Sequence, residues 1–236
     1  MLTGRSYSQY CGVARALDLI GERWALLVVR ELVLGPKRFT DLRQGLPGIA
    51  TNVLSLRLRQ LEHDGIIARR RLPPPAPAHL YELTEYGREL VPVMLSLGRW
   101  GAQRLGTRRP EESLRAGWLA VALKAFFRPE AAEGLSATVG LDFGDEQFTL
   151  AIVDGELEVR AGSETETDLT ITTDPETLIA YLAGAPVEPA VEGNADLLER
   201  VRACFPFGTP TGPPEATTSL SRDAARRRAR SASSSR

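Results

Sequence analysis

The first third of the chain carries polar side chains whose types suit contacts with a polyanion. Three successive arginines, Arg69 to Arg71, are followed after a proline-rich stretch by His79, and such cations can pair with phosphate oxygens. Upstream, Asn52, Ser55 and Arg59 recur at three- and four-residue steps, which places them on one face of a helix. Side chains of these types form hydrogen bonds with base edges in the major groove of DNA. The pattern therefore predicts nucleic-acid binding.

Helices must hold these side chains in place, and apolar spacing predicts four of them. In the last, Leu54, Leu58 and Leu61 form one apolar stripe, so Asn52, Ser55 and Arg59 point away from it. A Gly45–Gly48 turn precedes that helix. The four predicted helices are Val13–Ile20, Trp24–Leu34, Thr40–Gln44 and Ala50–Asp64.

A hairpin follows directly. Residues Ile66–Leu72 and Leu80–Leu83 are strand-like, and a stiff, proline-rich segment, Pro73–His79, separates them. Helix, turn, helix and basic hairpin together are typical of a mainly α winged helix-turn-helix, in which the hairpin is the wing. An inert basic helical domain would not need all of these features in this order.

Charge divides the chain into parts. Residues 1–110 carry 17 Lys and Arg against 9 Asp and Glu, whereas residues 111–215 carry 6 against 20. The basic part suits DNA and the acidic part would be repelled by it. We therefore expect a DNA-binding and dimerisation domain at residues 1–108 and a second domain at 112–206. A disordered tail rich in Pro, Ser and Arg is expected at 207–236.

A long helix predicted over Thr84–Leu105 has more apolar surface than one domain easily covers. One stripe runs through Tyr86, Leu90, Val93, Leu97 and Trp100, and a second through Val91, Leu95, Ala102 and Leu105. Two stripes favour a homodimer, although the second domain could instead cover the extra one. Pro92 removes an interior donor and should kink this helix. The candidate dimerisation residues are Leu90, Val91, Val93, Leu95, Leu97 and Trp100.

The acidic part predicts an α+β domain. An apolar helix over 114–128 precedes a meander of hairpins, and Asp174-Pro175-Glu176 should begin a helix that runs to Ala183. A last helix is expected over Asn194–Ala203. The predicted strands are Ser136–Phe143, Gln147–Val153, Glu156–Ala161, Asp168–Thr173 and Ala190–Gly193.

Residues 7–103 strongly resemble HxlR-type winged-helix transcriptional regulators, which are related to MarR-like repressors. The resemblance rests on matching segments in order: Tyr10–Gly21, Arg23-Trp24, Arg38–Leu42, Leu58–Glu62 with Gly65–Ile67, and Tyr81–Thr84. It implies a dimer whose recognition helices enter major grooves and whose wings lie over the backbone or minor groove. The implied groove-facing set is Thr51, Asn52, Ser55, Arg57 and Arg59, and the implied wing contacts are Arg69, Arg70, Arg71 and His79. Gly12 departs from the proline that this family often has after the cysteine.

Cys11 has two interpretations. Some members of the resembled family use a cysteine near this position to sense oxidants or electrophiles, and a helix start can lower a thiol pKa. The alternative is a small apolar residue that packs the first helix. We expect the other cysteine, Cys204, to pack only.

Metal and enzyme functions find little support. The two cysteines stand 193 positions apart and only two histidines accompany them, so no metal site is expected. Phosphate-loop, nucleophile-elbow and dinucleotide-binding motifs do not occur. We therefore expect a protein that is not an enzyme and needs no cofactor.

The acidic part looks like the sterol-carrier-protein fold, with the likeness spanning about residues 114–206. It rests on Asp168–Thr172, Asp174–Leu178, Gly184 and Val191–Asn194. The resemblance implies an apolar tunnel for a lipid-like ligand, whereas a filled core would have the same apolar pattern. The candidate lining residues are Phe126, Phe143, Phe148, Leu150, Ile152, Leu178 and Tyr181.

Together these features predict a homodimeric transcriptional repressor that binds double-stranded DNA and responds to a hydrophobic small molecule. The longest apolar run is far below the ~18 residues of a membrane span and no signal peptide begins the chain, so we expect it in the cytoplasm, without membrane contact. Two other classes stay open. One is a lipid carrier with the winged helix as dimer scaffold, and the other is a redox switch that works through Cys11.

Overall fold

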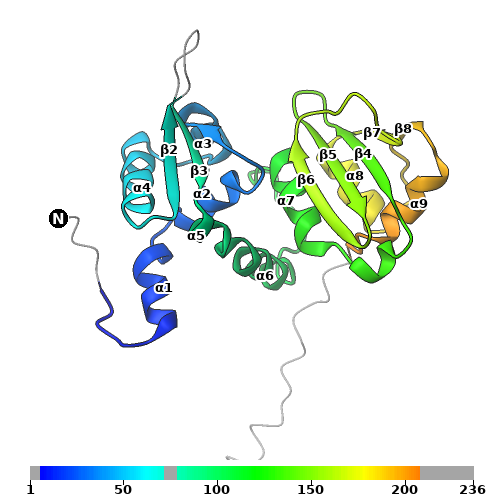
Figure 1. The fold of residues 1–236 in the computed structure, drawn as a ribbon. Coiled ribbons are helices and arrows are strands. Elements are labelled where there is room, and N and C mark those ends of the chain that lie inside the picture. The colour runs from blue at the N-terminus through cyan, green and yellow to red at the C-terminus, as the bar shows by residue number, and fades with distance from the viewer. Residues whose placement is uncertain (1–5, 72–78, 208–236) are drawn as a thin grey trace, which may run out of the picture.

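The computed structural model describes residues 6–71 and 79–207, whose buried hydrophobic side chains form two clusters (Figure 1). One cluster fills the part of the chain from α1 (Gly12–Ile20) to α6 (Leu90–Ala102), which we call the N-terminal unit. The other lies between a five-stranded sheet and helices α7 to α9, which form the C-terminal unit. Residues 73–78 of the predicted hairpin tip, Pro73–His79, and residues 208–236 of the tail predicted at 207–236 lie outside the described residues.

The four helices predicted for the N-terminal unit are confirmed. Glycine-containing turns separate them, and Leu54, Leu58 and Leu61 face the core as their spacing indicated. The first helix projects from the body of the unit (Figure 1), and Ala14 is its buried residue. The helices are α1 at Gly12–Ile20, α2 at Ala25–Leu32, α3 at Phe39–Gly45 and α4 at Thr51–His63.

The wing is a small antiparallel sheet. Strand β2 (Ile67–Arg71) pairs with β3 (His79–Leu83), which confirms the predicted hairpin. A third strand, β1 (Lys37–Arg38), pairs with the other edge of β3. The sequence did not indicate β1, because two residues are too few to show a strand period.

The helix expected over Thr84–Leu105 is broken in two. Helix α5 covers Glu85–Arg88 and α6 covers Leu90–Ala102. A proline ring clashes with the carbonyl four residues before it, which for Pro92 is that of Arg88, where α5 ends. The prediction of a single long helix was therefore wrong, and the kink predicted at Pro92 explains the break.

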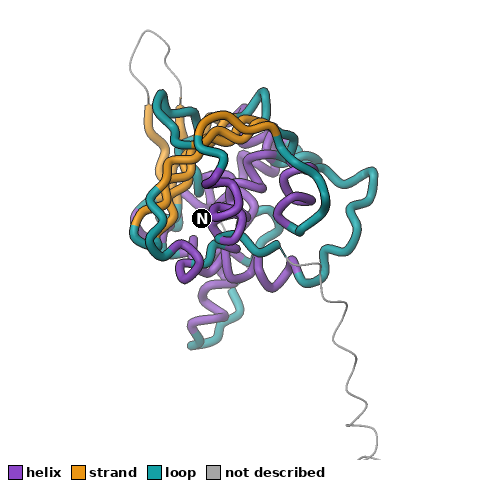
Figure 2. The backbone as a smooth tube through the Cα atoms, turned by 90° about the vertical axis from the view of Figure 1, so that its right-hand side faces the viewer, coloured by secondary structure: helices purple, strands orange, loops and turns teal. Residues whose placement is uncertain are grey.

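The C-terminal unit has helices on one face of a sheet, and its α+β character is confirmed (Figures 1 and 2). The order β6-β5-β4-β7-β8 is antiparallel except for β4 and β7, which run parallel. The strands are β4 Ala137–Asp142, β5 Gln147–Val153, β6 Glu156–Ala161, β7 Leu169–Thr172 and β8 Ala190–Gly193. The helices are α7 Ala116–Phe126, α8 Pro175–Leu182, α9 Asp196–Ala203 and the short 3-10 helix η1 Pro129–Ala132.

Helix α7 belongs to both cores. Leu119 and Leu123 are buried in the cluster against the sheet, whereas Val121 is buried in the cluster of the N-terminal unit. A helix that buries opposite faces needs apolar residues all round, as the sequence of α7 has. The two units therefore meet at α7, which packs on α2 and α6.

Candidate nucleic-acid interface

Helices α3 and α4 form a helix-turn-helix with a shared core. Leu42 of α3 and Leu54 of α4 are fully buried. Gly48, in the turn between them, has φ +86°, a left-handed conformation that glycine adopts without steric cost. The carboxylate of Asp41 accepts a hydrogen bond from the backbone N–H of Arg38 at 3.0 Å, which stabilises the start of α3.

The outward face of α4 carries the polar side chains that the sequence singled out. Thr51, Asn52 and Arg59 are exposed, and Ser55 is half-buried. Ala50 caps the helix without a side-chain hydrogen bond, so backbone N–H groups at its start are open to a phosphate oxygen. This face can form hydrogen bonds with base edges and with the phosphate backbone of DNA.

Arg57 does not belong to that face. The residue is 8% exposed, its Nη1 donates to Gln60 Oε1 at 2.5 Å, and its Nη2 lies 3.3 Å from Glu22 Oε2. Position 57 follows Leu54 by three residues, so it turns toward the core side of the helix. The groove-facing role implied for Arg57 is wrong for this chain, and the residue instead ties α4 to the loop between α1 and α2.

The wing presents its cations to solvent. Arg69, Arg70 and Arg71 on β2 are exposed, as is His79 on β3, directly opposite Arg71. Arg70 Nε lies 3.5 Å from Glu82 Oε1 on β3, an ion pair that a phosphate must replace if Arg70 is to bind it. The hairpin thus carries positive charge on both of its faces.

Comparison with known proteins decides the family. A model of the HxlR-like helix-turn-helix family matches residues 19–109. The HTH-type transcriptional regulator sll1512 of Synechocystis sp. is 41% identical over 107 residues, which are 45% of this chain and 79% of that protein. The regulator YdeP of Bacillus subtilis is 42% identical over 91 residues, 39% of this chain and 71% of that protein. The chain belongs to the HxlR-like family of helix-turn-helix transcriptional regulators.

Among solved structures, a chain described as the redox regulator HypR in its reduced form is similar to the same part. It is 38% identical, with a TM-score of 0.37, over 39% of this chain and 90% of that chain. The relatives sll1512 and YdeP are HTH-type transcriptional regulators by name. Along residues 6–71 and 79–207 no helix has the length and apolar character that crossing a bilayer requires. In the same ranges, no cluster of His, Cys, Asp and Glu has the makeup of a metal site.

In this HxlR-like chain, the candidate dimerisation residues divide into two sets. Val93, Leu97 and Trp100 are 58%, 45% and 70% exposed and form an open apolar face on α6. Leu90, Val91 and Leu95 instead pack against the core of their own unit, which also contains Val121 of α7. Of the second stripe, Val91 and Leu95 are therefore covered by the chain itself, whereas Leu105 is 74% exposed.

Cys11 stands at the start of α1 and is exposed. The backbone N–H groups of Ala14 and Val13, at the start of α1, lower the pKa of its thiol below the ordinary value. Cys204 follows the last residue of α9 and is buried, and burial raises the pKa of that thiol. Their environments thus favour reaction at Cys11.

The candidate ligand-lining residues surround almost no empty space. Most of them are buried in the C-terminal core, where the cavity bounded by Leu150, Leu178 and Tyr181 measures about 10 Å³. That volume holds at most one water molecule. Phe126 and Phe143 are only partly buried, and Phe126 stacks near Phe207 with ring centroids 5.0 Å apart. The described conformation has the filled core that the sequence left open as the alternative.

Sequence reasoning missed one central residue of the interface between the units. Glu31 lies on α2 and is 5% exposed, and its carboxylate bonds to partners from both units. The signal available was a carboxylate in an apolar helical stripe, which requires buried partners. Neither the partners nor their positions could be read from the sequence spacing.

Proposed function

We propose that the protein is a sequence-specific transcriptional repressor that binds double-stranded DNA as a homodimer. The observation that carries this proposal is the exposed polar face of α4 beside a wing with three exposed arginines. The acidic C-terminal unit is joined at α2 and α6. A helix-turn-helix with these features reads one major groove per subunit.

The residues divide by role. Asn52, Ser55 and Arg59, with Thr51 at the helix start, contact base edges and set the sequence preference. Arg69, Arg70, Arg71 and His79 contact the phosphate backbone and supply most of the salt-dependent affinity. Arg57 takes no part in base reading, because its guanidinium is held by Glu22 and Gln60.

The dimer forms through the apolar face of α6 and the apolar side of α1. Val93, Leu97 and Trp100 on α6 and Val13 and Leu17 on α1 are all exposed in the single chain. Exposed apolar side chains gathered on a helix face favour burial against a partner. A second copy of the chain presents the same surface, so a two-fold symmetric contact satisfies both.

The C-terminal unit is the regulatory part and responds to a hydrophobic small molecule. The sequence likeness to the sterol-carrier-protein fold supports this role, together with a sheet that has helices on one face and an apolar core. Since the cavity there measures about 10 Å³, a ligand has to open the core between α8, α9 and the sheet. It regulates only if its affinity differs between the free and DNA-bound protein.

A fluorescence-anisotropy titration tests this function. The probes are random duplex DNA and the chain's own upstream region, at two salt concentrations, with and without a mixed pool of fatty acids and sterols. Tighter, salt-sensitive binding to the upstream fragment that weakens with the pool is expected. Ligand binding without affinity for either duplex would instead favour a lipid carrier.

The geometry of Cys11 favours one second candidate, a thiol-based switch. Its thiol is exposed and has a lowered pKa. It can form a disulfide with Cys11 of the partner subunit if an oxidant such as diamide accepts the two electrons and two protons. Diamide would then release the wild type from DNA and leave Cys11→Ser bound. Release of both proteins, or of neither, contradicts the switch.

A further inference from the structure

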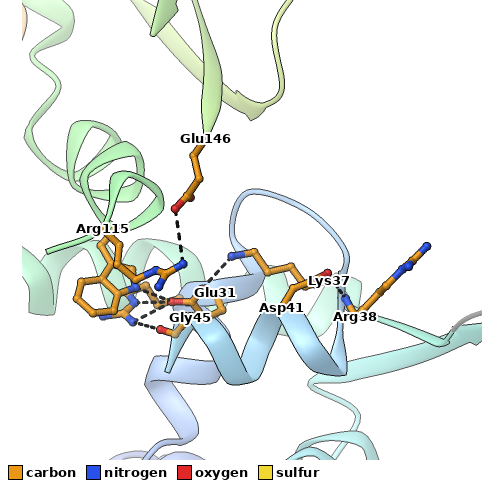
Figure 3. A network of polar contacts seen from close by, with 9 residues as sticks. Glu31, Lys37, Arg38, Asp41, Gly45, Arg115 and Glu146 are labelled. Carbon is orange, nitrogen blue, oxygen red and sulfur yellow. Dashed lines mark hydrogen bonds and ion pairs between the residues drawn. The ribbon is translucent and has the colours of Figure 1, made fainter. Parts of the chain in front are cut away.

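Glu31 is a buried carboxylate whose two oxygens are used by different partners (Figure 3). Oε1 accepts hydrogen bonds from Arg30 Nη2 at 2.8 Å and Nε at 3.2 Å, and Oε2 accepts from Lys37 Nζ at 2.8 Å. Burial lowers the pKa of the Arg30 guanidinium, and the adjacent carboxylate opposes that shift. A carboxylate this deep is tolerated only because cations and donors surround it.

The same carboxylate touches both ends of α3, the first helix of the helix-turn-helix. Lys37 lies on β1, two residues before α3 begins, and β1 pairs with wing strand β3. At the other end, Gly45 is the last residue of α3, and its carbonyl accepts from Arg30 Nη2 at 3.4 Å. Gly45 also approaches Glu31 so closely that a β-carbon there would collide with Oε2. Moving Glu31 therefore moves the entry to α3, its exit, or both.

The C-terminal unit reaches this carboxylate through Trp118 of α7. The indole Nε1 donates to Glu31 Oε1 at 2.8 Å, and the Arg30 guanidinium lies 4.3 Å from the centre of the indole ring. Three residues earlier on the chain, Arg115 lies 3.7 Å from Glu146, next to β5 (Figure 3). The start of α7 thus has one polar contact to the turn between β4 and β5 and one to the carboxylate beside α3.

We infer that Trp118 is a positioning residue for DNA binding. Through its hydrogen bond to Glu31, the C-terminal unit fixes α3 and the wing strand β1. This inference rests on the proposed function for its effect on DNA. Its effect on α3 is independent of DNA. The contact lets the C-terminal unit act on the helix-turn-helix, because displacing α7 removes a hydrogen-bond donor from the Glu31 carboxylate that holds α3.

The test compares two substitutions on the same helix. Trp118→Phe keeps an aromatic ring beside Arg30 but removes the N–H donor to Glu31. Val121→Ala weakens the same interface between the units, since Val121 is 6% exposed in the N-terminal core, without removing any donor to Glu31. Amide hydrogen exchange of α3 and β1 in the full chain reads the positioning directly, and anisotropy titration with the upstream duplex reads its effect on binding.

Trp118→Phe is expected to speed exchange across Lys37–Leu46 and to weaken duplex binding about tenfold. Val121→Ala should lower the melting temperature while leaving both readouts near the wild type. Unchanged exchange in Trp118→Phe, or equal changes in the two variants, overturns the inference. If the wild type binds no duplex, the proposed function fails, and the exchange data still decide the role of Trp118. If Trp118→Phe does not fold, amide hydrogen exchange in Lys37→Gln becomes the deciding measurement. Faster exchange in α3 is expected, and unchanged exchange overturns the inference.

Discussion

Gly45 lies directly against the carboxylate of Glu31, with no room for a β-carbon between them. The contact brings the end of α3 next to the middle of the buried charge network, where Arg30 bonds both the carboxylate and the Gly45 carbonyl. Any side chain at position 45 has to displace Glu31 from its donors. The requirement for glycine here is one of space, since this residue is not among those with positive φ.

Gly45→Ala should therefore destabilise the protein. Displacing a packed, buried side chain costs about 1–3 kcal/mol, and the donors of Glu31 are disturbed in addition. Thermal unfolding of the variant against the wild type measures the loss. Gly12→Ala is the matched control, because a β-carbon on Gly12 meets no atom within 4 Å. Equal melting temperatures for Gly45→Ala and Gly12→Ala would contradict this account.

Base reading and phosphate binding can be separated by two substitutions. Arg59→Ala should relax base preference by about 1–3 kcal/mol, because the role proposed for Arg59 is that of a bidentate donor to a base edge. Arg70→Ala should weaken all duplexes alike and reduce the slope of log K against log salt by at most about one, since Glu82 already pairs with this arginine. Anisotropy titrations on cognate and random duplexes at several salt concentrations measure both.

Arg57→Ala serves as the control for that pair. Its guanidinium is bonded to Gln60 and Glu22, so its loss should cost stability of about 1–2 kcal/mol without changing the ratio of cognate to random affinity. Equal losses on cognate and random DNA for Arg59→Ala would show that Arg59 reads no base. A changed base preference in Arg57→Ala would restore that residue to the groove-facing set.

Local patterns predicted the elements of this fold better than the contacts between them. The stripe of Leu54, Leu58 and Leu61 placed α4, and the Asp174-Pro175 start placed α8, because each signal lies within a few neighbouring residues. Arg57 was misplaced because the family resemblance supplied it, although its position three residues after Leu54 puts it on the core side of α4. Trp118 and Glu31 are separated by 87 positions, and no periodicity relates them. The packing of Val91 and Leu95 beside Val121 likewise depends on how the two units meet, which sequence spacing does not show.

The apolar face of α6 should hold two subunits together. Leu97→Glu places a charge in the middle of that face and should weaken dimerisation by about 2 kcal/mol or more, which is about thirtyfold in the dissociation constant. Sedimentation velocity over a range of concentrations measures it. Val153→Glu, on a residue of β5 that is 51% exposed, is the matched control and should leave the mass unchanged. A wild type that sediments as a monomer at high concentration would contradict the dimer.

The two cysteines should differ widely in reactivity. Cys11 is exposed and backbone N–H groups lower the pKa of its thiol, so iodoacetamide should modify it first and at a pH below that needed by a free cysteine. Cys204 is buried, burial raises the pKa of its thiol, and its Sγ lies 3.3 Å from the Arg200 carbonyl. Mass spectrometry of tryptic peptides follows both sites. Modification of Cys204 at the rate of Cys11 in folded protein would be inconsistent with the buried position.

Asp174 should make the C-terminal unit less stable in acid. Its Oδ1 accepts from the backbone N–H groups of Glu176 and Thr177 at 2.9 and 3.0 Å, and its Oδ2 accepts from the Thr177 hydroxyl at 2.6 Å. The Thr177 bonds lower the pKa of this carboxyl below its ordinary value. The charged form therefore stabilises the folded state fully above the ordinary pKa of an aspartate, and the contribution is lost as the pH falls through the lowered value.

Asp174→Ala should cost about 1 kcal/mol at neutral pH, as loss of a helix N-cap does, and the difference from the wild type should shrink in acid. Urea unfolding at several pH values measures this, and a difference that grew with acidity would contradict the sign.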